Sequence, residues 1–207
     1  MATSQLSEQK ERQLVEKVEL RFALADTPQK FEQSLDTFLA PLLLKLASPY
    51  APVRQAVFNS LKDTLSRLGS LKEVKLPVQK LIQQAQEPSV PINHDSANVR
   101  LYSLLLASKG VDRIDDEDVV ALTSTVIKRI SKLPGTARAR MFFILCKLLL
   151  KWNPPLKGSE KEEEVKGLFE PMDGDDKEFL LSKFTQFYLL TPAKTDPQSG
   201  VIPRGYT

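Results

Sequence analysis

The sequence contains very few of the side chains that carry out chemistry at protein sites. Its 207 residues include one cysteine, Cys146, and one histidine, His94. One cysteine cannot form an intrachain disulfide, and one cysteine with one histidine cannot supply the ligands of a Cys/His zinc site. We therefore expect neither feature, and a chain so poor in cysteine fits a reducing compartment.

Sequence patterns typical of enzymes are also missing. There is no glycine-rich phosphate loop, and the Lys-Gly-Ser at 157–159 lacks the upstream glycine and strand that a P-loop needs. Carboxylates run together at 115–118 and 162–164, but neighbouring residues on a helix do not face a common point. We interpret His94 as a surface loop residue and Cys146 as a small buried hydrophobe. We expect no catalysis, no cofactor and no small-molecule substrate.

Long apolar runs are absent as well. The longest stretch, Met141–Leu150, is interrupted by Lys147 and is too short to span a bilayer. Residues 1–20 lack the apolar core of a signal peptide. We therefore expect no membrane insertion and a cytoplasmic and nuclear location.

The net charge of +3 is small and unevenly distributed. Residues 160–178 hold nine acidic and three basic residues, so the rest of the chain carries +9. Lysines and arginines gather between residues 128 and 140, without interleaved aromatics or a known nucleic-acid reader motif. We expect a solubilising edge or a protein-contact patch there, and no nucleic-acid partner.

The residues that are present predict an all-α fold. Apolar residues recur at helical spacing throughout, and no segment alternates with period two. A first helix is expected at 8–25, and Thr27 with Pro28 should cap the next one, in which Pro41 removes a hydrogen bond and bends the axis. Gly69 and Gly110 are expected to end later helices. Asp175 or Asp176 should cap a final helix at 175–190.

Helix pairs recur along the chain at 28–68, 76–110 and 116–152, with starts 48 and 40 residues apart. Repeats of about this length are typical of stacked HEAT-type pairs. We therefore predict a right-handed α-solenoid of HEAT-like antiparallel helix pairs, with the helix at 8–25 as its N-terminal cap. A charged connector at 153–174 and an irregular tail at 191–207 follow, and the tail suggests truncation.

A short motif opens the second helix of each predicted pair: Val53-Arg54, Val99-Arg100 and Ala139-Arg140. The small or branched residue should pack at the turn. The arginine either reaches carbonyl or acidic groups of a neighbouring repeat, or is a solvated first-turn arginine. Together with Pro41, these residues form the predicted structural motif.

Several short segments follow one another in a specific order: Val18–Arg21, Ala25–Thr27, Phe38–Ser48, Val53-Arg54, Lys75–Val78 and Gln86–Pro88. In this order they resemble the N-terminal region of the proteasome component Ecm-twenty-nine family, which are very large HEAT-repeat proteins. The likeness is close over residues 14–110 and looser beyond. It implies a non-catalytic scaffold that binds the core and regulatory particles of the 26S proteasome and stabilises or monitors their association.

Two other functions remain open at this point. Another HEAT-type interaction module, in nuclear transport or membrane traffic, would share the same helix pattern. An enzyme is suggested by nothing more than the scattered carboxylates and His94.

Overall fold

The computed structural model describes residues 2–90, 95–152, 167 and 172–190. Within these residues every regular element is a helix, so the all-α prediction is confirmed. In chain order the elements are α1 (Ala2–Ala23), α2 (Pro28–Leu44), the short 3-10 helix η1 (Lys45–Ala47), α3 (Ala51–Ser70), α4 (Val78–Gln86), α5 (Ala97–Val111), α6 (Asp116–Ile127), α7 (Gly135–Lys151) and α9 (Gly174–Leu190).

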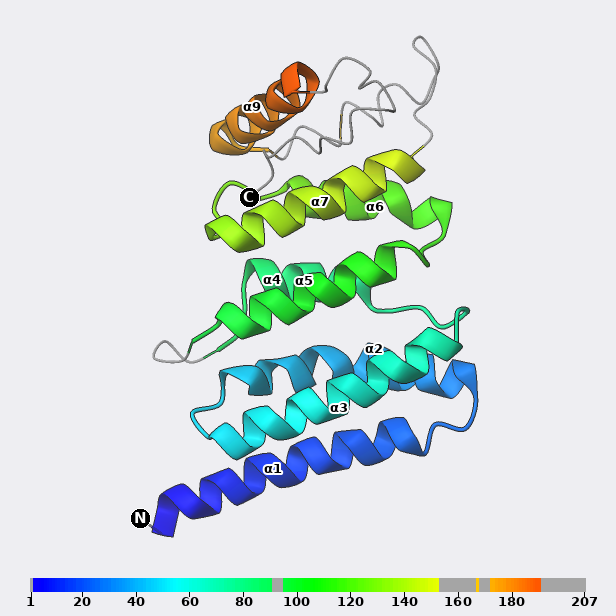
Figure 1. The fold of residues 1–207 in the computed structure, drawn as a ribbon, viewed down its shortest axis with the longest axis vertical. Helices are drawn as coiled ribbons and strands as arrows, with labels where there is room; N and C mark the ends of the chain where they lie inside the picture. Colours follow the sequence, from blue (N-terminus) through cyan, green and yellow to red (C-terminus); the bar gives the residue numbers. More distant parts are fainter. Residues whose placement is uncertain (1, 91–94, 153–166, 168–171, 191–207) are drawn as a thin grey trace, which may run out of the picture.

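The helices lie one above another along the long axis of the molecule, with α1 at one end and α9 at the other (Figure 1). Two rows run along this axis. Helices α3, α5 and α7 form the row nearer the viewer, called here the front row, and α2, α4 and α6 form the back row. Packing within the rows joins α5 to α7 and α4 to α6, and packing between them joins α4 to α5 and α6 to α7.

Local sequence accounts for the start of α2. Thr27 is extended, its side-chain oxygen accepts a hydrogen bond from the Lys30 amide at 3.2 Å, and Pro28 is the first helical residue. The predicted cap is therefore confirmed. Pro41 lies inside α2, as expected, on its exposed side.

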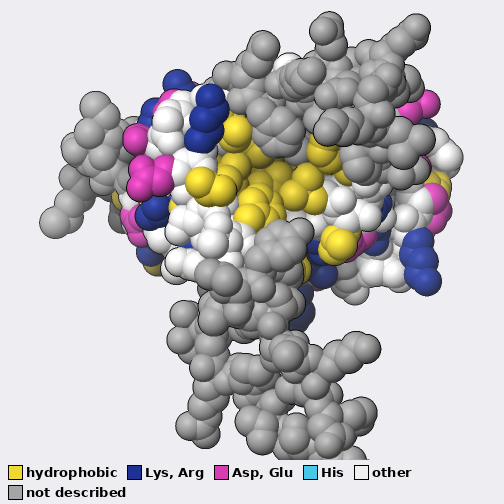
Figure 2. All heavy atoms as spheres, turned by 90° about the horizontal axis from the view of Figure 1, so that it is seen from above, with side chains coloured by type: hydrophobic (Ala, Val, Ile, Leu, Met, Phe, Trp, Pro, Cys, Tyr) yellow, Lys and Arg dark blue, Asp and Glu magenta, His cyan; other side chains and the backbone are white. Residues whose placement is uncertain are grey.

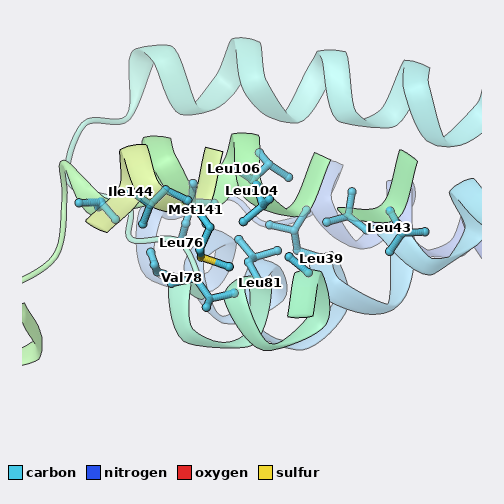
Figure 3. Packing of buried hydrophobic residues seen from close by; sticks show 14 of the residues in the cluster. Leu39, Leu43, Leu76, Val78, Leu81, Leu104, Leu106, Met141 and Ile144 are labelled. Atoms are coloured by element: carbon cyan, nitrogen blue, oxygen red, sulfur yellow. The ribbon is translucent and has the colours of Figure 1, made fainter. Parts of the chain in front are cut away.

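One hydrophobic core runs through the stack from α1 to α9. Each large side chain in it gains about 2 kcal/mol by leaving water. Figure 3 shows side chains from both rows meeting in this interior, among them Leu39 and Leu43 of α2, Leu81 of α4, Leu104 and Leu106 of α5, and Met141 and Ile144 of α7.

Two helices continue past the glycines that were expected to end them. Gly69 lies inside α3 and Gly110 inside α5. Gly69 has open space around it, whereas a Cβ on Gly110 would come within 2.4 Å of Val78 Cγ2. Gly110 therefore permits close packing of α5 on the start of α4, and capping does not explain it.

Other boundaries also differ from expectation. Helix α1 begins at Ala2 rather than near residue 8. Just after α6, Arg129 adopts a φ of 58°, which turns the chain. In α9 the cap is Asp173, whose carboxylate accepts from the Asp176 amide at 2.9 Å, and neither Asp175 nor Asp176 has this role.

Some predictions lie outside the described residues. His94 and the tail at 191–207 do so entirely, and the connector at 153–174 does so except for residues 167 and 172–174. The division into repeats at 28–68, 76–110 and 116–152 stays a prediction.

Candidate functional site: the helix joints and exposed faces

The first two Val-Arg motifs occupy equivalent places. Val53 and Val99 are each the third residue of their helix and are fully buried. Arg54 donates from Nη1 to the Ser48 carbonyl at 2.7 Å. Arg100 donates to the carbonyls of Ala85 and Gln86, and burial lowers its pKa. The arginines reach carbonyl groups, as one alternative held: the acceptor of Arg54 lies just before α3, and the acceptors of Arg100 are the last two residues of α4.

The third motif lies two residues earlier in the chain than the predicted Ala139-Arg140. Ala139 and Arg140 are both exposed. Ala137 is buried as the third residue of α7, and Arg138 follows it with its guanidinium 5.5 Å from the centre of the Phe179 ring in α9. Ala137-Arg138 is therefore the structural equivalent of Val53-Arg54, and Arg140 is free of this packing role.

A second series of cations, which could not be recognised from the motifs above, joins α1 to α3 and then successive helices of the front row. Arg67 of α3 donates to the carbonyl of Phe22 in the last turn of α1, at 2.6 Å, and to that of Ala25 just beyond this helix. Arg113, just after α5, donates to three carbonyls at the end of α3 and beyond it: Leu68 at 2.8 Å, Leu71 at 2.8 Å and Val74 at 3.0 Å.

Lys147 of α7 completes this series by donating to the Ser108 carbonyl of α5 at 2.9 Å and to the Asp112 carboxylate at 2.8 Å. The last carbonyls of a helix lack partners within it and carry partial negative charge, so a cation is suited to them. The sequence does contain a signal for this series of cations: Arg67 and Arg113 are 46 residues apart, the same separation as Arg54 and Arg100.

The joint to α9 uses a carboxylate instead. Asp176 is 1% exposed and accepts hydrogen bonds from the amides of Arg129, at 2.8 Å, and Ser131, at 2.9 Å, and from the Ser131 hydroxyl. The positive φ of Arg129 belongs to the turn that presents these groups. A buried carboxylate with several donors is well satisfied, so Asp176 fixes α9 on the turn after α6.

Ion pairs link neighbouring levels of the stack on the side of the back row. They are Lys80–Asp36 at 2.7 Å, Lys75–Asp115, Arg129–Glu87 and Lys132–Asp173. Lys132 lowers the pKa of Asp173, and Asp115 raises the pKa of Lys75. All eight side chains are more than a third exposed, so each pair stabilises the fold only slightly.

The two rows differ strongly in charge. The back-row helices hold two lysines and five carboxylates. The front-row helices hold nine basic residues and one carboxylate, Asp63. The nine are Arg54, Lys62, Arg67, Arg100, Lys109, Arg138, Arg140, Lys147 and Lys151.

The end of the stack at which α9 lies is apolar at its centre. Figure 2 looks onto this end and shows hydrophobic side chains gathered there, with charged side chains toward the margin. The aromatic rings of Phe142, Phe179 and Phe184 pack together here, with centroids 5.4 to 6.2 Å apart around Phe142. This end is continuous with the core.

One small hollow lies between α1, α2 and α3. Its volume is about 140 Å³, and Phe22, Phe31, Ser60 and Arg67 are among its lining residues. Ser60 Oγ is buried there without a hydrogen-bond partner. Since one water takes up about 30 Å³ in the liquid, the hollow suits a few water molecules, whereas drug-sized ligands occupy about 300 to 1,000 Å³.

Other chemistry has little support among the described residues. They include no group of three His, Cys, Asp or Glu side chains placed to hold a metal ion. Cys146 is half-buried, and burial raises its pKa, which reduces its reactive thiolate fraction. In the described part of the chain, no helix combines the length and apolarity needed to cross a membrane.

Comparisons with known proteins give consistent results. Residues 15–207 match the family described as "Proteasome component ECM29, N-terminal". The chain is 53% identical to "Proteasome component ECM29" of Saccharomyces cerevisiae over 201 residues, which is 97% of this chain and 11% of that protein.

More distant relatives match over similar stretches. Identity is 28% to the "Proteasome-associated protein ECM29 homolog" of Drosophila melanogaster, over 94% of this chain and 10% of that protein. It is 26% to the human "Proteasome adapter and scaffold protein ECM29", over 77% of this chain and 8% of that protein. No solved structure gives a significant match. The chain spans about a tenth of the length of these relatives and belongs to the ECM29 family, whose N-terminal region it matches.

Proposed function

We propose that the chain is a right-handed α-solenoid of HEAT-type pairs, formed by α2 with α3, α4 with α5 and α6 with α7, with α1 as the cap. The two rows in Figure 1 support this architecture. The polar contacts repeat in the same way. Arg54 and Arg100 each link the second helix of a pair to carbonyls at or after the end of the first helix. Arg67 and Arg113 join successive levels of the stack. Such a fold offers long surfaces rather than an enclosed pocket.

The proposed activity is that of a non-catalytic scaffold that binds the 26S proteasome and stabilises or monitors the association of its core and regulatory particles. The observation that carries this proposal is the 53% identity to a protein named as a proteasome component. The human relative is named as an adapter and scaffold, which fits a role without catalysis. Location in the cytoplasm and nucleus belongs to the same proposal, and fluorescence microscopy of the tagged chain tests it.

Binding to assembled proteasomes tests the function directly. The tagged 207-residue chain is mixed separately with purified 26S proteasomes, free core particles and free regulatory particles, and bound material is measured on native gels. We expect the chain to migrate with the 26S form and to slow its dissociation at raised salt. A helical protein of similar size and charge is the control. If the chain bound none of the three particles, the proposal would be refuted.

A further inference from the structure

A cluster of basic residues lies on the exposed side of α7 and the adjoining part of α5. Arg140, Phe143, Lys147, Leu150 and Lys151 follow one another at intervals of one, three or four residues, so they share one side of α7. Lys147 reaches across to Ser108 and Asp112, so the neighbouring Lys109 of α5 lies beside this row. We call these six residues, Lys109, Arg140, Phe143, Lys147, Leu150 and Lys151, the basic stripe.

Within the part of the chain that the structure describes, few carboxylates pair with the charges of the basic stripe. Lys147 pairs with Asp112. Among the described residues, no carboxylate lies within ion-pair distance of Lys109, Arg140 or Lys151. On the back row, by contrast, cations and carboxylates of successive levels pair with each other. As far as the described ranges extend, the front-row helices therefore carry a net positive charge that is largely unpaired.

Apolar side chains stand within the same stripe. Phe143 is 58% exposed and Leu150 is 87% exposed, and neither belongs to the core. The Lys147 ammonium lies 5.7 Å from the centre of the Phe143 ring, which keeps the aromatic and the cation together. An exposed aromatic and leucine between cations favours a partner that offers both carboxylates and aliphatic side chains.

We propose that the basic stripe is a docking surface for an acidic protein segment that carries leucine or similar apolar residues. Charge complementarity argues for the acidic partner, and Phe143 with Leu150 argues for protein rather than nucleic acid, for which aliphatic anchors offer little. As a contact on the proteasome, the proposal rests on the proposed function. The chemistry of the stripe can be tested without it.

Fluorescence anisotropy with synthetic peptides measures the chemistry. The probes are 20-residue peptides composed of Glu and Leu, of Lys and Leu, and of Glu and Ser, together with a 20-nucleotide single-stranded RNA. The wild-type 207-residue chain should bind the Glu/Leu peptide best and the Lys/Leu peptide not at all. Binding should weaken with rising salt because the charges are exposed.

Two pairs of variants locate the surface. R140E/K151E should weaken Glu/Leu binding about tenfold or more, whereas K128E/K177E, which makes the same charge change at exposed sites elsewhere, should change it less than about twofold. F143S/L150S should weaken binding roughly fivefold. L20S/L24S, which removes two exposed leucines at and just after the end of α1, is its control. Circular dichroism checks that all four variants remain folded.

The outcomes separate the two proposals. If R140E/K151E binds the Glu/Leu peptide as wild type does, or if the Lys/Leu peptide binds equally well, the docking surface is refuted. Equal binding of RNA and Glu/Leu peptide, with F143S/L150S affecting neither, also refutes it, because the stripe would then be a general polyanion site.

Co-purification with 26S proteasomes completes the design. A wild-type chain that binds proteasomes while R140E/K151E binds equally well leaves the proposed function intact and overturns the docking surface. A chain that binds the Glu/Leu peptide through the stripe, but no proteasome, supports the stripe and overturns the function.

Discussion

The joint between α3 and α5 and the joint between α6 and α9 satisfy backbone groups in opposite ways. At the first, the Arg113 guanidinium donates to three carbonyls at and beyond the end of a helix. At the second, the buried Asp176 carboxylate accepts from the amides of a turn and from a serine hydroxyl. Helix stacking therefore does not demand one motif. It demands that exposed backbone dipoles at each level find a charge of the right sign.

The largest expected effect comes from breaking the arginine joint. Arg113→Ala leaves three carbonyls with one fewer donor and should lower the free energy of unfolding by about 4 kcal/mol. Arg113→Lys keeps the charge but loses the planar fork, so it should cost clearly less. Urea unfolding followed by circular dichroism gives both values. Equal stabilities for wild type and Arg113→Ala would show that this joint is not a structural element.

Breaking the carboxylate joint should have a more local effect. Asp176→Ala leaves the partly buried amides of Arg129 and Ser131 without this acceptor, at a cost of about 3 kcal/mol. Since Asp176 fixes α9 on the turn after α6, amide hydrogen exchange should accelerate in α9 and at residues 129–131, and remain slow in α4 and α5. Uniform acceleration throughout the chain would contradict a local joint. Asp176→Asn, which keeps one acceptor oxygen, should lie between wild type and alanine.

Two glycines of the front row test how tightly the helices pack beside the arginine joint, because Gly110 lies close to Arg113. Gly110→Ala would push a Cβ into Val78 and Leu76 and should destabilise the protein by about 2 kcal/mol. Gly69→Ala is the matched control, because nothing lies within 4 Å of the added carbon inside α3. That change should stabilise by about 0.5 kcal/mol, as alanine does in a helix. Thermal unfolding shows whether the two signs are opposite.

The smallest effect concerns the exposed Lys132–Asp173 pair near the carboxylate joint. Lys132 lowers the pKa of Asp173 below 3.8, so this carboxylate stabilises the folded state above pH 3.8. The contribution declines as the pH falls below 3.8 through the lowered pKa. Asp173→Asn should therefore show a slightly lower Tm than wild type at pH 6, and the difference should vanish in acid. A difference that persisted at pH 2 would exclude the ionic explanation.

Regular features of the chain were predictable from its sequence. Periodic apolar residues gave the all-α class, and Thr27-Pro28 gave the start of α2, because both depend on local geometry that the sequence displays directly. Val53-Arg54 and Val99-Arg100 were also found, since valine and arginine recur together. The partner carbonyls of the arginines were not predictable, because a carbonyl is present at every residue and leaves no pattern.

Other features depended on tertiary contact. Gly110 resembled a helix cap, yet its role is to admit Val78, a residue 32 positions earlier. Asp176 resembled a capping residue because it lies in the first turn of a helix, and only the fold shows that it faces the turn at Arg129 and Ser131. The charge difference between the rows could be counted only once the pairing of helices assigned each helix to a face.

The arginine joints have a consequence for how such a chain tolerates change. Arg67 and Arg113 bind the oxygen of the peptide bond and not the side chain that the accepting residue carries. Substitutions at Phe22, Leu68 or Leu71 therefore alter packing but leave the acceptor in place, whereas loss of the guanidinium removes the tie altogether. The hydrogen bonds of each joint should therefore be lost only when the donor changes, whereas substitutions at the acceptor positions should cost no more than the packing of their side chains.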